Sequence, residues 1–129
     1  MPSDQPPLRF RRSQRLVHAL EFEAVFAQRC SVQRGPLRIH ARLAFAPGVT
    51  RLGLSIGKRV GIATARTALK RRLREAFRLE QHALPNGMDL VISAHAHEPR
   101  TLPTYRDALR SAAAELHARL SRRPSGPTP

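Results

Sequence analysis

Residues 58–78 read KRVGIATARTALKRRLREAFR and combine a dense block of positive charge with apolar side chains at helical spacing. The segment holds eight lysine or arginine residues and one acid, Glu75, so it contributes +7 to a net charge of +14. A block of like charges usually stays disordered, because the charges repel one another. Here the interleaved apolar residues predict an amphipathic helix that begins near Ile62.

The predicted helix has an apolar face and a basic face. At 100° per residue the apolar side chains fall within an arc of about 120°, and the basic side chains fill an adjoining arc of roughly 140°. The apolar set is Ile62, Ala65, Leu69, Leu73, Ala76 and Phe77, and the basic set is Arg66, Lys70, Arg71, Arg74 and Arg78. Arginine outnumbers lysine, and its planar fork matches phosphate oxygens. The basic face therefore predicts a polyphosphate partner, and a nucleic acid above all.

The flanking sequence predicts further helices and strands around this segment. Apolar residues recur at helical spacing in 18–29 and 104–120, and they alternate with other residues in 37–45 and 51–57. Residues 88–94 are almost all apolar, which suits a central strand covered on both faces. In chain order we predict a helix at 18–29, strands at 31–33, 37–45 and 51–57, the charged helix, a strand at 88–94 and a helix at 104–120. The Leu84-Pro85-Asn86-Gly87 turn should end the charged helix.

Length and composition predict one domain with polar tails. The chain has 129 residues, enough for a single core. Proline-rich segments predict flexible tails at 1–9 and 122–129 around a domain at 10–121. No apolar run approaches the roughly 18 residues of a membrane span, and the first residues lack an apolar stretch of secretory-signal length. We therefore expect a cytoplasmic protein with no membrane partner.

Cysteine and histidine usage does not suggest thiol or metal chemistry. Cys30 is the single cysteine, so we expect it to pack as a small apolar residue with no disulfide-linked partner. His95 and His97 would share one face of a strand, which is compatible with a pair of metal ligands. No further ligand stands at a defined spacing, and no nucleophile motif or phosphate-binding glycine loop is present. We expect no metal site and no catalytic residue in the protein.

The charged helix and the strand before it resemble the bacterial ribonuclease P protein component. The resemblance rests on GLSIGKRVG at 53–61 and on the helix residues Arg66, Lys70, Arg71, Arg74, Glu75 and Phe77. It extends to FEAVF at 22–26 and MDLVISA at 88–94, and it covers most of positions 8–120. Thr67 and Ala68 stand where the family usually has Asn and Arg, and Ile62 stands where it often has Asn. These departures shorten the set of RNA contacts that the resemblance implies.

The resemblance implies an α+β sandwich of αβββαβα order, similar to a domain found in ribosomal proteins. A small mixed sheet would carry helices, with a left-handed β-α-β crossover around the basic helix. The implied function is that of a subunit of an endoribonuclease, which removes the 5′ leader of precursor tRNA by phosphodiester hydrolysis. Catalysis would reside in the RNA subunit, with Mg²⁺ bound mainly through RNA. The implied partners are ribonuclease P RNA and precursor tRNA.

The resemblance assigns two sets of binding residues. Those expected to bind the catalytic RNA are Lys58, Arg59, Arg66, Lys70, Arg71 and Arg74. Those expected to bind the single-stranded leader, in a cleft between the first helix and the sheet, are Arg15, Phe22, Phe26, Arg38 and His40, with Arg42 as a further source of charge. Phe22 and Phe26 could instead be core residues. An RNA-binding accessory protein of ribosome assembly stays open as an alternative function.

Overall fold

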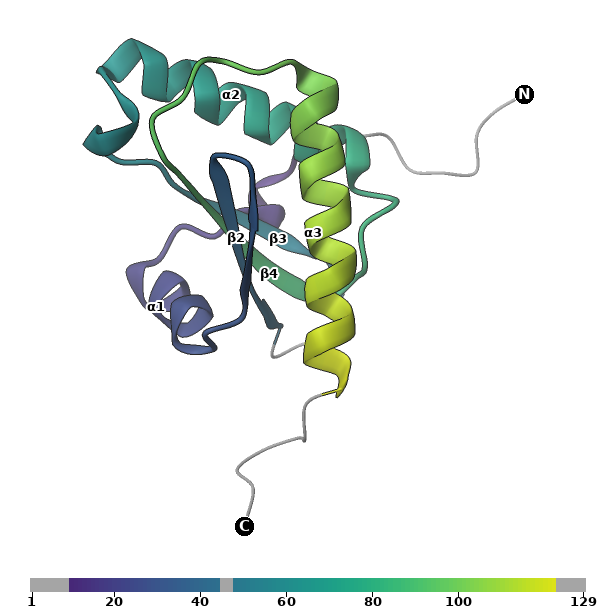
Figure 1. The fold of residues 1–129 in the computed structure, drawn as a ribbon. Coiled ribbons are helices and arrows are strands. Elements are labelled where there is room, and N and C mark those ends of the chain that lie inside the picture. Colours follow the sequence, from purple (N-terminus) through teal and green to yellow (C-terminus); the bar gives the residue numbers. More distant parts are fainter. Residues whose placement is uncertain (1–9, 45–47, 123–129) are drawn as a thin grey trace.

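A computed structural model describes residues 10–44 and 48–122, which form a four-stranded sheet between two layers of helices (Figure 1). The elements are η1 (Arg12–Gln14), α1 (Ala19–Ala27), β1 (Ser31–Arg34), β2 (Leu37–Leu43), β3 (Arg51–Ser55), η2 (Lys58–Val60), α2 (Ala63–Glu80), β4 (Met88–Ala94) and α3 (Leu102–Arg122), where η marks a 3₁₀ helix. The predicted αβββαβα order is confirmed, with η1 and η2 added. The predicted tails lie outside the described residues, apart from Arg122, which ends α3.

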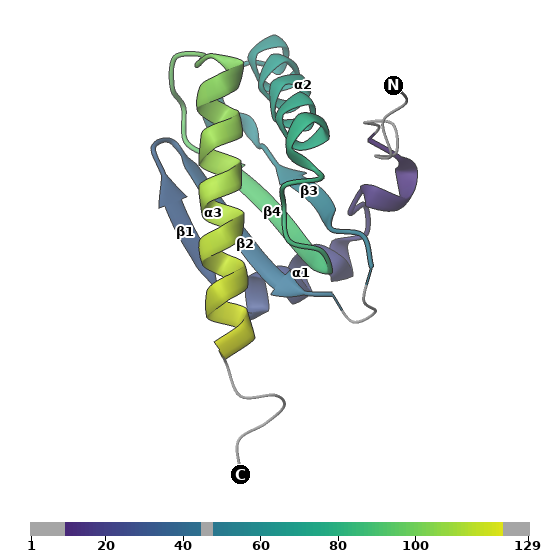
Figure 2. The ribbon, with the colours of Figure 1, turned by 90° about the vertical axis from the view of Figure 1, so that its right-hand side faces the viewer.

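The sheet has the strand order β1-β2-β4-β3. β2 pairs antiparallel with β1 and β4, whereas β3 pairs parallel with β4. Figure 2 shows α2 and α3 in front of the sheet, with β3 and β4 both running upward and β4 to the left of β3. The chain leaves β3, descends through α2 and returns as β4, so the crossover is left-handed. The hand implied by the resemblance is confirmed, although right-handed crossovers are the strong default.

The main core lies between the sheet and the layer formed by α2 and α3. Alternate residues of β2 point into it, and the apolar stripe of α2 covers it, as the periodicity predicts. The core members from β2 and α2 are Leu37, Ile39, Ala41, Leu69, Leu73, Ala76 and Phe77. Ile62 was predicted to join them, but its side chain is 74% exposed. It precedes α2 with an extended backbone, so helical periodicity no longer governs its direction.

A smaller core joins α1 to the opposite face of the sheet. Leu16, Val25 and Val91 are buried together there, and Phe22 packs against them. Gly53 makes this approach possible, because a Cβ on Gly53 would lie 2.7 Å from the Phe22 ring. Since β4 has a helical layer on each side, its nearly continuous apolar sequence is explained.

Several predicted boundaries shift by a few residues. The predicted 37–45 strand ends at Leu43, whose side chain is 44% exposed rather than inward, and Phe45 lies outside the described residues. β3 ends at Ser55, because the chain turns into η2. Cys30 is buried, as expected for a small apolar residue. None of the helices in residues 10–44 and 48–122 is long and apolar enough to cross a membrane.

Candidate nucleic-acid interface

The basic face of α2 has no acidic partner in the described chain. Arg66, Lys70, Arg71 and Arg74 form no ion pair within residues 10–44 and 48–122. Glu75, the acid of this helix face, pairs with Arg78 instead, and the hydrogen bond from Arg78 holds the pKa of Glu75 below its usual value. The four cations therefore keep their full charge for a partner outside the described residues.

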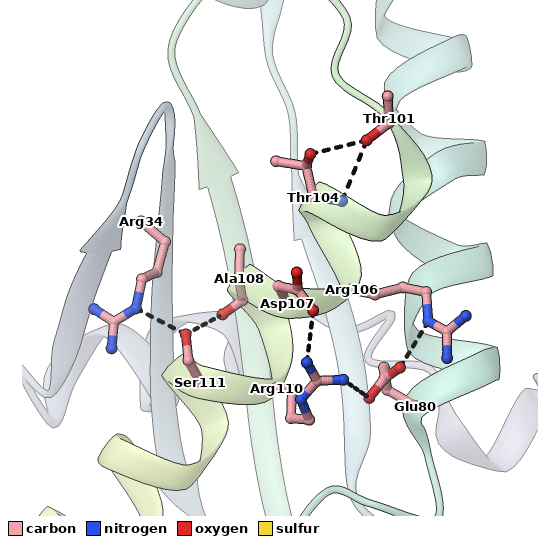
Figure 3. Close-up of polar contacts among 9 residues, drawn as sticks. All are labelled: Arg34, Glu80, Thr101, Thr104, Arg106, Asp107, Ala108, Arg110 and Ser111. Atoms are coloured by element: carbon pink, nitrogen blue, oxygen red, sulfur yellow. Dashed lines mark hydrogen bonds and ion pairs between the residues drawn. The ribbon is translucent and has the colours of Figure 1, made fainter.

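Most acids elsewhere in the described part of the chain are paired with other arginines. Figure 3 shows Glu80, which is buried, between Arg106 of α3 at 2.7 Å and Arg110 at 3.0 Å. On the α1 side of the sheet, Asp89 is fully buried and accepts hydrogen bonds from arginines of β2 and β3. Much of the positive charge on α3 and on the strands is thus neutralised within the fold, in contrast to the face of α2.

Arg66 has a further unsatisfied group. Its side chain is half-buried, and the buried Nε atom has no hydrogen-bond partner among the described residues. A buried donor without an acceptor costs about 1–3 kcal/mol. The charge of Arg66 forms no ion pair among the described residues, and it is this charge, not the covered Nε atom, that is available to an anionic ligand.

Lys58 and Arg59 lie on η2, the turn that leads into α2, and both are exposed. Gly61 ends this turn with φ 151°, a conformation that residues with a side chain rarely adopt. The turn directs Arg59 toward the α1 side of the sheet, where it lines a cavity. Arg59, which was expected to bind the catalytic RNA, therefore lies in the wall of the predicted leader cleft.

That cavity, of about 420 Å³, opens between the end of α1 and the sheet. It brings together three of the five residues that were assigned to leader binding. Residues of η2 and β4, and the residue that follows β4, also line it. Its lining residues include Phe26, Arg38, His40, Arg59, Ser93 and His95. We call this cavity the α1 cleft.

Phe26 and His40 form the aromatic part of the α1 cleft. Their ring centroids lie 4.7 Å apart at an interplanar angle of 82°, and Phe26 is 38% exposed. His40 Nε2 lies 3.3 Å from Ser93 Oγ, which restrains the imidazole ring. Burial, and to a smaller extent the positive charge of Arg38, lowers the pKa of His40 from its usual value, which favours the neutral ring. Exposed rings beside cations are the arrangement that stacks on single-stranded bases.

The structure separates Phe22 from Phe26. Phe22 packs over Gly53 against the small core under α1, whereas Phe26 lines the α1 cleft. Two of the predicted cations lie apart from the cleft. The Arg15 guanidinium lies 4.8 Å above the Phe10 ring, and Arg42 donates to the buried Asp89 at 2.8 Å. The cations in the cleft wall are Arg38 and Arg59.

The prediction that His95 and His97 share one face of a strand was wrong. β4 ends at Ala94, so neither residue follows strand alternation. His95 lines the α1 cleft, whereas His97 Nε2 lies 2.7 Å from the hydroxyl of Tyr105 on the α3 side. Within the described residues, no group of three His, Cys, Asp or Glu side chains could hold a metal ion.

Sequence reasoning did not assign Ser93 and His95 to the cleft. Ser93 pairs in register with Arg38, so the two side chains lie on the same face of the sheet. The signal in the sequence is a polar residue that interrupts the apolar run of β4, and only the register turns that signal into a position in the cleft.

Comparison with known proteins agrees with this fold. The family model described as Ribonuclease P matches residues 10–117. The ribonuclease P protein component of Bordetella avium is 41% identical over 112 residues, which cover 84% of this chain and 92% of that protein. The ribonuclease P protein component of Chlamydia abortus is 33% identical over 79 residues, which cover 61% of this chain and 57% of that protein.

Solved structures show the same architecture. The RNase P protein from Thermotoga maritima superposes with a TM-score of 0.67 at 28% identity, covering 75% of this chain and 92% of that one. A Staphylococcus aureus RNase P protein mutant superposes with a TM-score of 0.71 at 21% identity, covering 81% and 89%, and this likeness concerns the fold alone. The family match, which spans most of the chain, and the relatives lead to one conclusion: the chain belongs to the ribonuclease P protein component family.

Proposed function

We propose that this protein is the protein subunit of ribonuclease P, which binds the catalytic RNA and the 5′ leader of precursor tRNA and so promotes removal of the leader. The observation that carries the proposal is the unneutralised basic face of α2, formed by Arg66, Lys70, Arg71 and Arg74. Family membership supports it, because the relatives are named as components of a ribonuclease.

The face of α2 would contact phosphates of the catalytic RNA. Each phosphate that a lysine or arginine neutralises releases counterions, which makes the affinity depend steeply on salt. By neutralising part of the RNA, the protein would let two polyanions, the catalytic RNA and the substrate, approach each other.

The α1 cleft would hold the leader. Phe26 and His40 would stack on bases, while Arg38 and Arg59 would neutralise the phosphates between them. η2 connects the cleft to the N-terminus of α2, so the leader would run next to the catalytic RNA. Since mature tRNA has no leader, these contacts would favour the precursor over the product.

Phosphodiester hydrolysis itself would be carried out by the RNA subunit, with Mg²⁺ held mainly by RNA phosphates. The protein would supply affinity and electrostatic neutralisation. On this proposal no protein side chain takes part in the bond-breaking step, and His95 serves as a wall residue of the α1 cleft.

The test combines the purified protein with a bacterial ribonuclease P RNA and precursor tRNA at a low Mg²⁺ concentration, at which the RNA alone cleaves poorly. We expect the protein to restore cleavage at the mature 5′ end. Binding to RNA without any stimulation would refute the proposal and favour the accessory protein of ribosome assembly. Cleavage by the protein without the RNA subunit would refute it in favour of a protein nuclease.

A further inference from the structure

A second cavity, of about 210 Å³, lies where α2 meets the loop 95–101. Helical geometry places it on the flank of α2 opposite Arg66, Lys70 and Arg74. Among its lining residues are Val60, Ala65, Ala68, Arg72, His97 and Pro99. The alanines leave the cavity open on the α2 side, and together with Val60 and Pro99 they make much of its surface apolar. We call this cavity the α2 slot.

Two flat polar groups at the α2 slot are held by hydrogen bonds. His97 Nε2 lies 2.7 Å from the Tyr105 hydroxyl, and His97 Nδ1 lies 2.8 Å from the carbonyl oxygen of His95. Tyr105 is only 2% exposed and also accepts a hydrogen bond from the Arg100 backbone N–H. Arg72 donates to the Arg100 carbonyl oxygen at 2.7 Å. The imidazole and the guanidinium are therefore restrained before any ligand arrives.

The two restrained flat groups and the apolar walls of the slot favour a ligand with a planar, uncharged ring that carries negatively charged groups beside the ring. Imidazole rings and guanidinium planes are surfaces on which unpaired bases stack, and the alanine methyl groups leave room for a thin ligand. The volume is below the roughly 300–1,000 Å³ of typical small-molecule pockets, which fits one ring system. Arg72 at the slot, and Lys58 on the turn that leads into α2, would attract the phosphates on either side of such a ring. Glu98, the acid of the loop, is exposed and does not line the slot.

We propose that the α2 slot binds one unpaired nucleobase of the RNA that contacts α2. This inference rests on the proposed function and extends it, because it adds a stacking contact to a surface that otherwise binds phosphates. The base comes from the catalytic RNA or from precursor tRNA, and the chemistry of recognition is the same for both.

The test fills the slot with Ala68→Phe, a change at an exposed position of α2. Ala114→Phe, at an exposed position of α3 outside the slot, is the matched control. Binding of ribonuclease P RNA to the protein, and of precursor tRNA to the holoenzyme, is titrated at several salt concentrations. We expect Ala68→Phe to weaken binding of one of the two RNAs roughly 5- to 150-fold, the range found for the loss of one stacked base. The RNA that loses affinity is the source of the base.

The salt dependence distinguishes a base contact from a phosphate contact. Ala68→Phe should leave the slope of log affinity against log salt unchanged, because it removes no phosphate contact. A shallower slope would overturn the proposal, as would affinities for both RNAs within twofold of the parent protein. An equal loss with Ala114→Phe would also overturn it, since the effect would then be unrelated to the slot.

A second pair of variants keeps the proposal testable if Ala68→Phe lowers the melting temperature. His97→Ala removes the flat ring, whereas His97→Phe keeps a flat ring without its hydrogen bonds. We expect His97→Ala to weaken the same RNA and His97→Phe to restore most of that loss. Equal affinities for the two variants would overturn the proposal. The parent protein, tested for low-Mg²⁺ cleavage in parallel, reports separately on the proposed function.

Discussion

Replacing Phe26 by alanine should weaken binding of precursor tRNA and leave binding of mature tRNA unchanged. Phe26 lines the α1 cleft, is 38% exposed, and contacts His40 through an edge-to-face pair at 4.7 Å. Loss of one aromatic ring that stacks on a base typically costs about 1–3 kcal/mol. The exposed ring contributes less to the core than a buried one, so we expect this loss to appear in affinity rather than in stability.

Phe22, one helical turn away, is the matched comparison. It packs over Gly53 beside Leu16, Val25 and Val91, and truncation of a buried phenylalanine costs roughly 3–5 kcal/mol of folding stability. Because Phe22 is partly exposed, we expect a value at the lower end of that range. Phe22→Ala should therefore lower the melting temperature and weaken both tRNA ligands alike, through a smaller folded fraction.

The assay titrates precursor and mature tRNA against the holoenzyme that contains each variant, with thermal melts of the protein alone. The ratio of the two affinities is the decisive quantity, since a change in the folded fraction cancels in it. An unchanged ratio for Phe26→Ala, together with a large loss of melting temperature, would refute the leader cleft. A changed ratio for Phe22→Ala would show that the division between the two rings is wrong.

Three further predictions concern charge. Replacing Arg66 and Arg74 together by alanine should weaken binding to ribonuclease P RNA and flatten the slope of log affinity against log salt by about 0.7–0.9 per lost phosphate contact, and an unchanged slope in a filter-binding titration would contradict the assignment of this face. Asp89→Asn should lower the free energy of unfolding, measured in urea, by roughly 3–5 kcal/mol, because it removes the buried carboxylate that Arg42 and Arg51 share. A loss below about 1 kcal/mol would show that these ion pairs are weak. The pKa of His40 is lowered in the folded state, so the unfolded chain takes up the proton more readily. The contribution of a neutral His40 to folding stability is therefore complete above pH 6.5 and is lost as the pH falls below it. His40→Asn should remove this part of the pH dependence of the melting temperature.

Local sequence patterns were sufficient for the individual elements. The stripe of Leu69, Leu73, Ala76 and Phe77 predicted the buried face of α2, because helical geometry repeats independently of what the helix packs against. The alternation in β2 likewise predicted a half-buried strand, and the apolar run of β4 predicted a central strand. The left-handed crossover followed from the family resemblance alone, since periodicity carries no information about hand.

The binding site was predicted in part. The basic face of α2 could be predicted because helix neighbours three and four residues apart are known from the sequence, and one acid lies among them. That most of the other described acids form ion pairs with arginines elsewhere in the fold could not be predicted. Glu80, for example, meets Arg106 and Arg110 only because α3 packs against α2.

Tertiary structure alone decided which residues share the α1 cleft. Phe22 and Phe26 are equivalent in the sequence, and Gly53 on a distant strand makes the first a packing residue. The separation of His95 from His97 follows from the end of β4 and from the buried hydroxyl of Tyr105. Periodicity reports how a side chain lies relative to its own element, whereas a cleft depends on how separate elements pack, and that depends on contacts between residues far apart in the chain.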